Sequence, residues 1–305
     1  MTGMATMSAT LPLLATGRTG LGKALAELTK VRISAMSSLT AAVGYVAFAR
    51  RMDWGILTAS LGTVLLAMGA SALNEWQERE YDALMVRTRN RPLPTGFFSP
   101  AVALIAALCL GAAGLLLLLA MHGGTAALLG LLAMVWYNGV YTPLKRVTAF
   151  AALPGSLIGA IPPAIGWAAA GGSVGEPAIL AIGFVFFIWQ VPHFWLLLLM
   201  YGEDYERAGF PTLTRRFGET RLTRLTFTWM GATAASCALL SLFSGILSWP
   251  SLALLVASAA WLVWKASALL RIQEGPMPFR RAFHQINLFA LLLMLSVVLD
   301  PLFVR

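Results

Sequence analysis

Residues 55–82 read GILTASLGTVLLAMGASALNEWQEREYD and join an apolar stretch of membrane length directly to a dense cluster of charge. Residues 55–73 contain no charged side chain, and about 20 such residues form a helix that crosses the ~30 Å hydrocarbon core of a bilayer. Residues 74–91 hold four carboxylates and four arginines, although the whole chain has only 13 acidic residues. Because charge beside lipid is costly to place, this cluster indicates a functional site.

The same apolar pattern recurs along the rest of the chain. A mean hydropathy of +0.76, with 58% hydrophobic and 11% charged residues, excludes an ordinary soluble globular protein. We therefore predict an all-α membrane protein with nine transmembrane helices. The predicted spans are residues 32–49, 55–73, 99–120, 123–141, 149–169, 177–200, 225–247, 249–270 and 284–303. Residues 1–20 are expected to form a disordered tail, and residues 21–305 a single transmembrane domain.

The net charge of +9 is explained by membrane topology. With nine spans and the N-terminus inside, eighteen of the 22 basic residues fall in the tail and in the loops of one side. Such a bias marks the cytoplasmic side. The sequence therefore predicts a multi-pass protein of the bacterial cytoplasmic (inner) membrane, with its N-terminus and active-site loops in the cytoplasm. The lipid bilayer is its expected partner, and nucleic acid is not.

Three oxygen-bearing side chains repeat at helical spacing in the charged cluster. Asn74, Glu78 and Asp82 lie four residues apart, so a helix places them on one face. Like charges at this spacing repel, and a hard cation relieves the repulsion. Mg²⁺ suits such a site because it takes few protein carboxylates and completes its shell with water and phosphate. The alternative for the triplet alone is a solvated helix end with mixed charge.

Basic side chains that suit phosphate accompany the acids. Arg87, Arg89 and Arg91 follow directly, and guanidinium binds phosphate through paired hydrogen bonds. Tyr141 and Lys145 end the fourth predicted span on the same side, and they can add a hydroxyl and an ammonium. Each group alone also fits an anchor at the lipid headgroups. Together they predict a magnesium–diphosphate site.

The sixth span carries His193 among several aromatic residues. These residues could line a pocket for a flat or polyene substrate, whereas a lone histidine can also simply join two helices by a hydrogen bond. With a diphosphate site, such a pocket favours ionisation of an isoprenyl diphosphate, in which cations stabilise the leaving group and aromatic faces the allylic cation. The glycines and prolines of the fifth span fit either close helix packing or a cavity wall. Cys109 and Cys237 are expected to be packing residues.

The motifs resemble those of the UbiA superfamily of intramembrane prenyltransferases. Asn74-x3-Glu78-x3-Asp82 resembles its first Asp-rich motif, and Tyr141-x3-Lys145 its YxxxK motif. Residues 82–94 (DALMVRTRNRPLP), residues 160–168 (AIPPAIGWA) and the segment Pro192-His193-Phe194-Trp195 are similar to the branch that farnesylates haem. The resemblance covers about residues 25–300.

This resemblance implies a helical bundle around a central cavity and Mg²⁺-dependent transfer from farnesyl diphosphate to a vinyl group of haem B. The product would be haem O for the assembly of haem-copper oxidases, and a homo-oligomer or oxidase assembly partners would be compatible with it. Carried over, the metal site would comprise Asn74, Glu78, Asp82 and Asp204. The diphosphate site would comprise Arg87, Arg91, Tyr141 and Lys145. The catalytic residues would be the four metal-site residues together with Lys145. His193 and Trp195 would contact the haem acceptor.

Two alternatives follow from other features of the chain. Residues 216–219 (RFGE) resemble the quinone and chlorophyll branches of the superfamily, which implies an aromatic acceptor such as a quinone precursor. A transporter that couples ions to its acids is the remaining alternative. However, the acids are predicted at the inner membrane surface, and coupling sites usually lie near the midplane.

Overall fold

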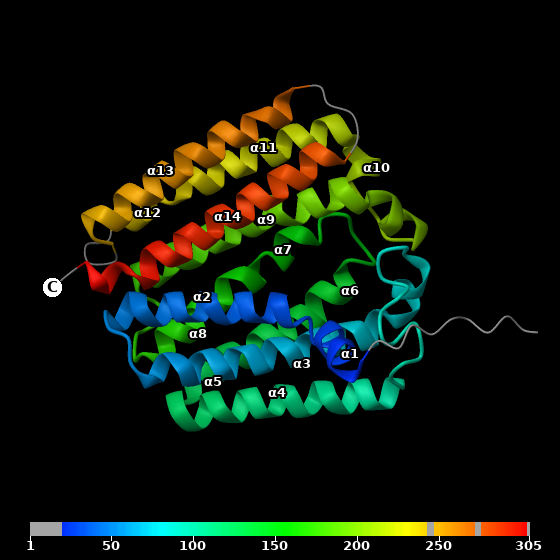
Figure 1. The fold of residues 1–305 in the computed structure, drawn as a ribbon, viewed down its shortest axis with the longest axis horizontal. Helices are drawn as coiled ribbons and strands as arrows, with labels where there is room; N and C mark the ends of the chain where they lie inside the picture. The colour runs from blue at the N-terminus through cyan, green and yellow to red at the C-terminus, as the bar shows by residue number, and fades with distance from the viewer. Residues whose placement is uncertain (1–19, 243–246, 272–275, 304–305) are drawn as a thin grey trace, which may run out of the picture.

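The computed structural model describes residues 20–242, 247–271 and 276–303, so the expected tail before residue 20 lies outside the described residues. The described residues form helices that pack side by side as a bundle (Figure 1). The first half of the bundle contains α1 Leu21–Leu28, α2 Val31–Ala49, α3 Trp54–Leu84, α4 Pro100–His122, α5 Gly124–Val135, the π-helix Trp136–Tyr141, α6 Thr142–Leu144, α7 Ala152–Gly155 and α8 Leu157–Ala169. The second half contains α9 Pro177–Arg207, α10 Leu213–Phe217, α11 Glu219–Ser236, α12 Ala238–Ser241, α13 Trp249–Ala266, the 3-10 helix Ser267–Leu270, α14 Met277–Val298 and the 3-10 helix Asp300–Leu302.

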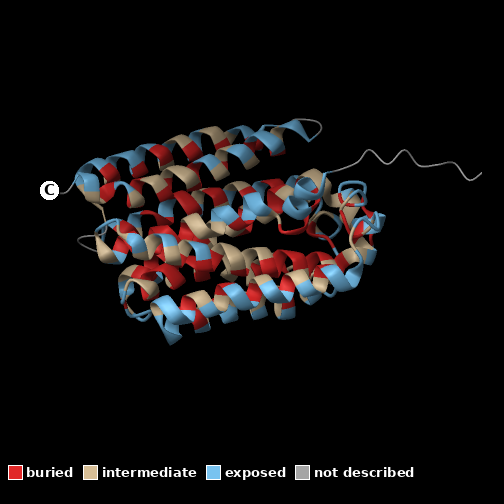
Figure 2. Ribbon diagram, turned by 60° about the horizontal axis from the view of Figure 1, so that its bottom comes forward, coloured by how far each residue is buried: buried red, intermediate tan, exposed pale blue. Residues whose placement is uncertain are grey.

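Eight helical segments within the described residues are long and apolar enough to cross a membrane. The expected seventh span, residues 225–247, falls outside this set: α11 begins with the charged Glu219, Arg221 and Arg224 and ends at Ser236, and residues 243–246 of the expected span lie outside the described residues. Helix α11 nevertheless packs along α9 and α13 as a member of the bundle. Many exposed residues are leucine, isoleucine or valine. Exposed positions lie on the outer sides of the helices, and buried positions lie towards the interior of the bundle (Figure 2). The chain is an all-helical, multi-pass integral membrane protein.

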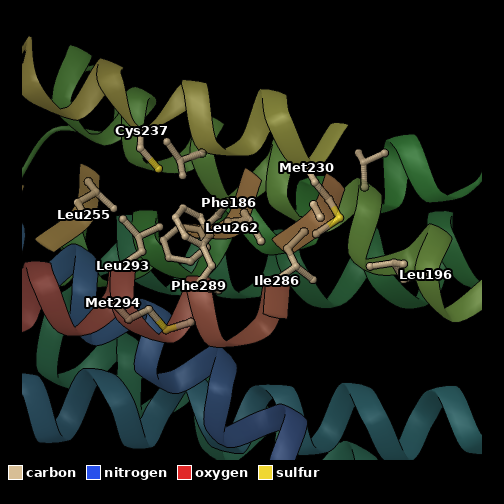
Figure 3. Close-up of a cluster of buried hydrophobic side chains, with 14 of the residues drawn as sticks. Phe186, Leu196, Met230, Cys237, Leu255, Leu262, Ile286, Phe289, Leu293 and Met294 are labelled. Atoms are coloured by element: carbon tan, nitrogen blue, oxygen red, sulfur yellow. The ribbon is translucent and has the colours of Figure 1, made fainter. Parts of the chain in front are cut away.

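The second half of the bundle encloses the largest buried apolar cluster. Helices α9, α11, α13 and α14 contribute to it, and Phe186, Met230, Leu262 and Phe289 are among its buried side chains (Figure 3). Cys237 is buried in this cluster, whereas Cys109 is exposed on the apolar helix α4. Both cysteines are free and occupy the packing positions that the sequence indicated.

Helices α2 and α8 approach so closely that only glycine fits at their crossing. A Cβ added to Gly44 would lie 1.8 Å from the Pro163 carbonyl oxygen, and one added to Gly166 would lie 1.7 Å from the Ala41 oxygen. Gly159 and Pro162 of the same α8 line a cavity. The glycines and prolines of the fifth predicted span therefore serve both roles that the sequence left open, which are close helix packing and the wall of a cavity.

Two inner segments differ from the loops that the hydropathy pattern predicts. The hydropathy pattern leaves residues 74–98 and 201–224 between predicted spans, but α3 continues unbroken to Leu84. In α9 the backbone is kinked at Tyr201, and a further helical stretch continues to Arg207. Hydropathy marks where a helix leaves the apolar layer, whereas backbone hydrogen bonding continues until a terminating residue. The extensions carry Asn74, Glu78, Asp82 and Asp204 on helical segments at the end of the bundle where α1, α6 and α10 also lie (Figure 1).

Candidate active site

A cavity of about 490 Å³ lies between the two halves of the bundle. Its wall is formed mainly by α2, α3, α5, the π-helix, α8, α9 and α14. Five basic and two acidic side chains line it, and these are Lys30, Arg32, Arg87, Arg91, Lys145, Glu78 and Asp82. Most of the remaining wall is apolar or aromatic. The cavity therefore suits a ligand that has an anionic head and an apolar body.

The three side chains that were predicted to share one helical face, Asn74, Glu78 and Asp82, form a polar stripe on α3, and this stripe faces the cavity. Asn74, Glu78 and Asp82 are all buried, with exposed fractions of 2%, 6% and 1%, and all three line the cavity. The Asn74 amide donates to Glu78 Oε2 at 2.9 Å, so the first two side chains are directly joined. The helical spacing thus concentrates oxygen ligands at one place in a low-dielectric wall.

A different basic residue reaches each member of the stripe. Lys145 Nζ donates to Glu78 Oε2 at 2.8 Å and lies 2.6 Å from Oε1. Arg91 Nη1 donates to Asp82 Oδ2 at 2.7 Å. Both carboxylates are therefore charge-balanced by groups that can also bind phosphate.

Lys30 is a site residue that sequence reasoning missed. Its Nζ donates to Asn74 Oδ1 at 2.7 Å, from a left-handed backbone conformation (φ 46°) at the break between α1 and α2. Burial and the neighbouring Arg91 lower the pKa of Lys30 to about 7. A non-glycine residue in this conformation is strained, and such strain gathers at functional sites. In the sequence Lys30 is one of several basic residues before the first span, and no sequence signal distinguishes it from the others.

Tyr141 and Lys145 follow one another on the cavity wall beside the acids. Tyr141 ends the π-helix, a rare element that often occurs at functional sites. Its ring stacks on Phe194 at 5.5 Å between centroids and on Tyr137 at 5.9 Å, and Lys145 Nζ lies 5.1 Å from its ring centroid. The predicted pair is therefore brought to Glu78, and an aromatic wall adjoins it.

Asp204 reaches the loop after α3 and does not join the acidic stripe on the cavity wall. Its Oδ2 accepts from the Arg87 amide at 3.2 Å, and its Oδ1 accepts from the Val86 amide at 3.4 Å and from Arg207 at 2.9 Å. Arg87 lines the cavity, and its guanidinium donates to the Tyr205 hydroxyl at 3.2 Å. In this arrangement Asp204 positions Arg87, and the metal role implied for Asp204 stays a prediction.

The two residues expected at the acceptor face different surroundings. His193 lines the cavity, and its Nδ1 lies 2.9 Å from Asn287 Oδ1 on α14. Trp195 instead lies among buried residues and packs on Trp229 at 5.6 Å between centroids. It does not line the large cavity in the described part of the chain. The acceptor role of Trp195 stays a prediction that this geometry does not support directly.

The oxygen ligands on α3 fit a divalent cation that shares its shell with phosphate. No group of three or more His, Cys, Asp or Glu residues that could hold a metal occurs among the described residues. Glu78 Oε1 is buried and receives no hydrogen bond, although Lys145 lies close to it. Glu78 and Asp82 therefore offer two carboxylates on the cavity wall, and a Mg²⁺ ion held there would complete its shell with phosphate and water.

Comparisons with known proteins connect this geometry to a family. Residues 35–293 match the UbiA prenyltransferase family. The chain is 43% identical over 220 residues to a protoheme IX farnesyltransferase of Geobacter sulfurreducens, covering 71% of this chain and 80% of that protein. It is 34% identical over 280 residues to the protein of that name from Oleidesulfovibrio alaskensis, covering 92% and 97%.

Solved structures show that the fold is shared. A digeranylgeranylglyceryl phosphate synthase structure superposes with a TM-score of 0.72 at 14% identity and covers 92% of this chain and 98% of that one. A UbiA homolog from Archaeoglobus fulgidus bound to GPP and Mg²⁺ superposes with a TM-score of 0.65 at 16% identity, covering 90% and 99%.

Proposed function

The chain belongs to the UbiA prenyltransferase family, and from this membership we propose that it transfers a farnesyl group from farnesyl diphosphate to a vinyl group of haem B, giving haem O. The observation that carries the donor half is the set of acids and bases that meet at one end of the cavity, with Glu78 paired to Lys145 and Asp82 paired to Arg91. The names of the relatives support haem as the acceptor.

The basic end of the cavity binds the diphosphate. Lys30, Arg87, Arg91 and Lys145 provide donors around the acidic stripe, so the departing diphosphate meets positive charge as its own charge grows. When bound, Mg²⁺ held by Asn74, Glu78 and Asp82 would neutralise part of this charge. Removing one preorganised donor from a site of this kind costs about 10²–10³-fold in rate.

The aromatic wall receives the farnesyl end. The stacked rings of Tyr141 and Phe194 lie beside Lys145, so an allylic cation formed there meets π-faces as the C–O bond to diphosphate breaks. The vinyl group then adds to this cation, and water adds to the resulting cation to give the hydroxyethylfarnesyl group. The apolar walls keep other water away until that step.

The residues that suggested a quinone-type acceptor lie away from this cavity. Arg216 is at the end of α10, where its guanidinium packs over Phe150, and residues 216–219 do not line the cavity within the described residues. We therefore favour haem B as the acceptor. We further propose that the protein resides in a bacterial inner membrane with the Lys145 end of the bundle in the cytoplasm, since the basic residues gather there. Its oligomeric state and any oxidase partners remain expectations.

One experiment tests both halves of the proposal. The protein is expressed in a bacterial host that makes haem B but no haem O, and extracted haems are analysed by mass spectrometry. We expect a haem that has gained a hydroxyethylfarnesyl group with the wild-type chain and none with Asp82→Asn. Purified Asp82→Asn should also lose Mg²⁺-dependent diphosphate release, whereas Glu80→Gln, an exposed change on the same helix, should retain it. Haem B that never gains the group would exclude the proposed acceptor.

A further inference from the structure

His193 and Asn287 join α9 to α14 at the cavity wall. The His193 Nδ1 atom lies 2.9 Å from Asn287 Oδ1, and both residues line the cavity. The pair lies outside the acids and bases that bind diphosphate. Its hydrogen bonding decides which imidazole nitrogen is free.

The Asn287 side chain has a fixed orientation. Its Nδ2 donates to the Phe283 carbonyl oxygen at 2.7 Å, one turn earlier on α14. The amide NH2 is therefore turned towards its own helix, and the amide oxygen faces His193. An oxygen can only accept, so Nδ1 of His193 must carry the proton. In the neutral ring, Nε2 is then left with its lone pair.

Aromatic rings hold the imidazole in place. The ring centroid of His193 lies 5.0 Å from that of Trp189 and 4.8 Å from that of Phe283. Phe194 adds an edge contact at 5.8 Å. A histidine whose Nδ1–H is bound to an oxygen and whose ring cannot turn is the arrangement that proteins use to present Nε2 to a metal.

We propose that His193 Nε2 is an axial ligand of the iron of the haem substrate, and that Asn287 is the positioning residue that fixes its tautomer. The inference rests on the proposed function, because it takes the acceptor to be an iron porphyrin. One Fe–N bond forms from the Nε2 lone pair, with no change in oxidation state and no proton released. Ligation would fix the position of the porphyrin in the cavity relative to Tyr141 and Lys145, and hence the vinyl group that reacts.

Spectroscopy of the purified protein tests ligation without requiring turnover. Haem B and metal-free protoporphyrin IX are titrated separately into wild type, His193→Ala, Asn287→Leu and His284→Ala. His284→Ala is the control, because His284 is an exposed histidine on α14, the helix that also carries Asn287. Soret shifts give the affinities, and resonance Raman spectra of the ferrous complex give the Fe–N(His) stretch.

We expect wild type and His284→Ala to show the Fe–N(His) stretch and to bind haem B at least tenfold more tightly than the metal-free porphyrin. His193→Ala should lose the stretch and this preference, and imidazole added to His193→Gly should restore the stretch. Asn287→Leu should weaken haem binding about tenfold or more and shift the stretch, as loss of an outer-shell partner does, while binding of metal-free porphyrin stays unchanged.

An Fe–N(His) stretch that persists in His193→Ala would overturn the proposal. So would a wild-type protein that binds both porphyrins equally, a comparison that requires no variant to fold. Failure of the proposed function is seen separately. If wild type shows the stretch but never produces a farnesylated haem, the ligand assignment stands and the reaction is wrong. If it produces haem O and His193→Ala keeps its spectrum and haem preference, the reaction stands and the assignment is wrong.

Discussion

Asp204 Oδ2 accepts a hydrogen bond from the backbone amide of Arg87 at 3.2 Å, and this bond joins the end of α9 to the loop after α3. The Val86 amide donates to the other oxygen at 3.4 Å. A carboxylate engaged by two successive amides holds the loop, and the loop holds the Arg87 side chain at the cavity.

Substitutions at Asp204 should separate loop positioning from metal binding. Asp204→Asn retains an amide oxygen that can still accept from Arg87, whereas Asp204→Ala retains none. We expect Asp204→Ala to raise the KM for farnesyl diphosphate about tenfold, since a charge-assisted bond contributes roughly 1.5–3 kcal/mol, and Asp204→Asn to have a smaller effect. Steady-state kinetics at several Mg²⁺ concentrations measure both variants. If both variants lose activity equally and require much more Mg²⁺, Asp204 is a metal ligand instead.

The pair Lys145 and Glu78 should show the signature of a buried ion pair. Lys145→Met leaves the Glu78 carboxylate buried without its partner, which costs about 3–5 kcal/mol in comparable cases. Thermal unfolding in detergent should show a clear loss of stability, and adding Glu78→Gln to Lys145→Met should restore much of it. Both proteins should lack activity. Lys265→Met, on α13 and over the Trp264 ring, is the control and should change neither property. A double variant no more stable than Lys145→Met would contradict this account.

The crossing of α2 and α8 should tolerate no added methyl group. A Cβ at Gly44 or Gly166 would overlap a backbone carbonyl oxygen of the other helix, and backbone cannot move aside as a side-chain tip can. We expect Gly44→Ala and Gly166→Ala each to destabilise the protein by about 1–3 kcal/mol or more, as overpacking does. Gly231→Ala inside α11 has no heavy atom within 4 Å of the added Cβ and should leave the unfolding temperature unchanged or slightly higher, because alanine is the better helix former. Equal effects at the three positions would exclude steric overlap as the cause.

The polar face of the site and its basic partners Arg91 and Lys145 were predictable, whereas Lys30 and the bond from Asp204 to the Arg87 amide were not. The spacing of Asn74, Glu78 and Asp82 gives one helical face without any tertiary information, and the structure places all three on the cavity wall. Lys30 lies 44 residues before Asn74 in the chain. Its contact depends on how α1 turns into α2, which no local pattern encodes. The bond between Asp204 and the Arg87 amide was equally hidden, because a backbone donor leaves no mark in the sequence.

The ends of the helices were also only partly predictable from the sequence. Hydropathy located the apolar part of each span, because lipid contact selects apolar side chains. It ended the second span too early, since α3 continues with polar residues to Leu84, whereas the end predicted for the sixth span, residue 200, coincides with the kink of α9 at Tyr201. Likewise, His193 stood out as a histidine within a span. Asn287, the residue that fixes its tautomer, looks in the sequence like an ordinary polar residue of another helix.

Stability should fall in acid through Asp53, which lies between α2 and α3. Hydrogen bonds from Arg51 and then from Tyr45 lower the pKa of Asp53 below its ordinary value, and its Oδ1 also caps α3 by accepting from the Gly55 amide. A carboxyl whose folded pKa lies below its unfolded value of about 3.9 stabilises the fold above that pH and loses this contribution as the pH falls through the folded pKa.

Asp53→Asn keeps a capping oxygen but cannot titrate. We expect wild type to unfold about 1–2 °C above Asp53→Asn at pH 6, and this difference to close as the pH falls towards 3. Thermal unfolding of both proteins in the same detergent at each pH isolates the Asp53 contribution, since all other carboxyls titrate in both. A difference that stays constant down to pH 3 would show that the charge of Asp53 has no role.

Lys30 combines a strained backbone with a functional side chain, so two substitutions should separate them. Its φ of 46° and ψ of 49° lie in the left-handed region, which costs a non-glycine residue about 1–2 kcal/mol and glycine little. Lys30→Gly and Lys30→Ala both remove the ammonium that donates to Asn74. Both should therefore bind a non-hydrolysable farnesyl diphosphate analogue about tenfold or more weakly, because a hydrogen bond from a charged group is lost. Isothermal titration measures this loss.

The unfolding temperature should distinguish the two variants. Lys30→Gly should unfold about 2 °C or more above Lys30→Ala, because only the glycine relieves the backbone. If Lys30→Gly is more stable than Lys30→Ala but binds the analogue more weakly than wild type does, the strained backbone at Lys30 serves to direct the ammonium group towards the diphosphate site. If Lys30→Gly binds the analogue as tightly as wild type, Lys30 serves the turn between α1 and α2 and not the diphosphate.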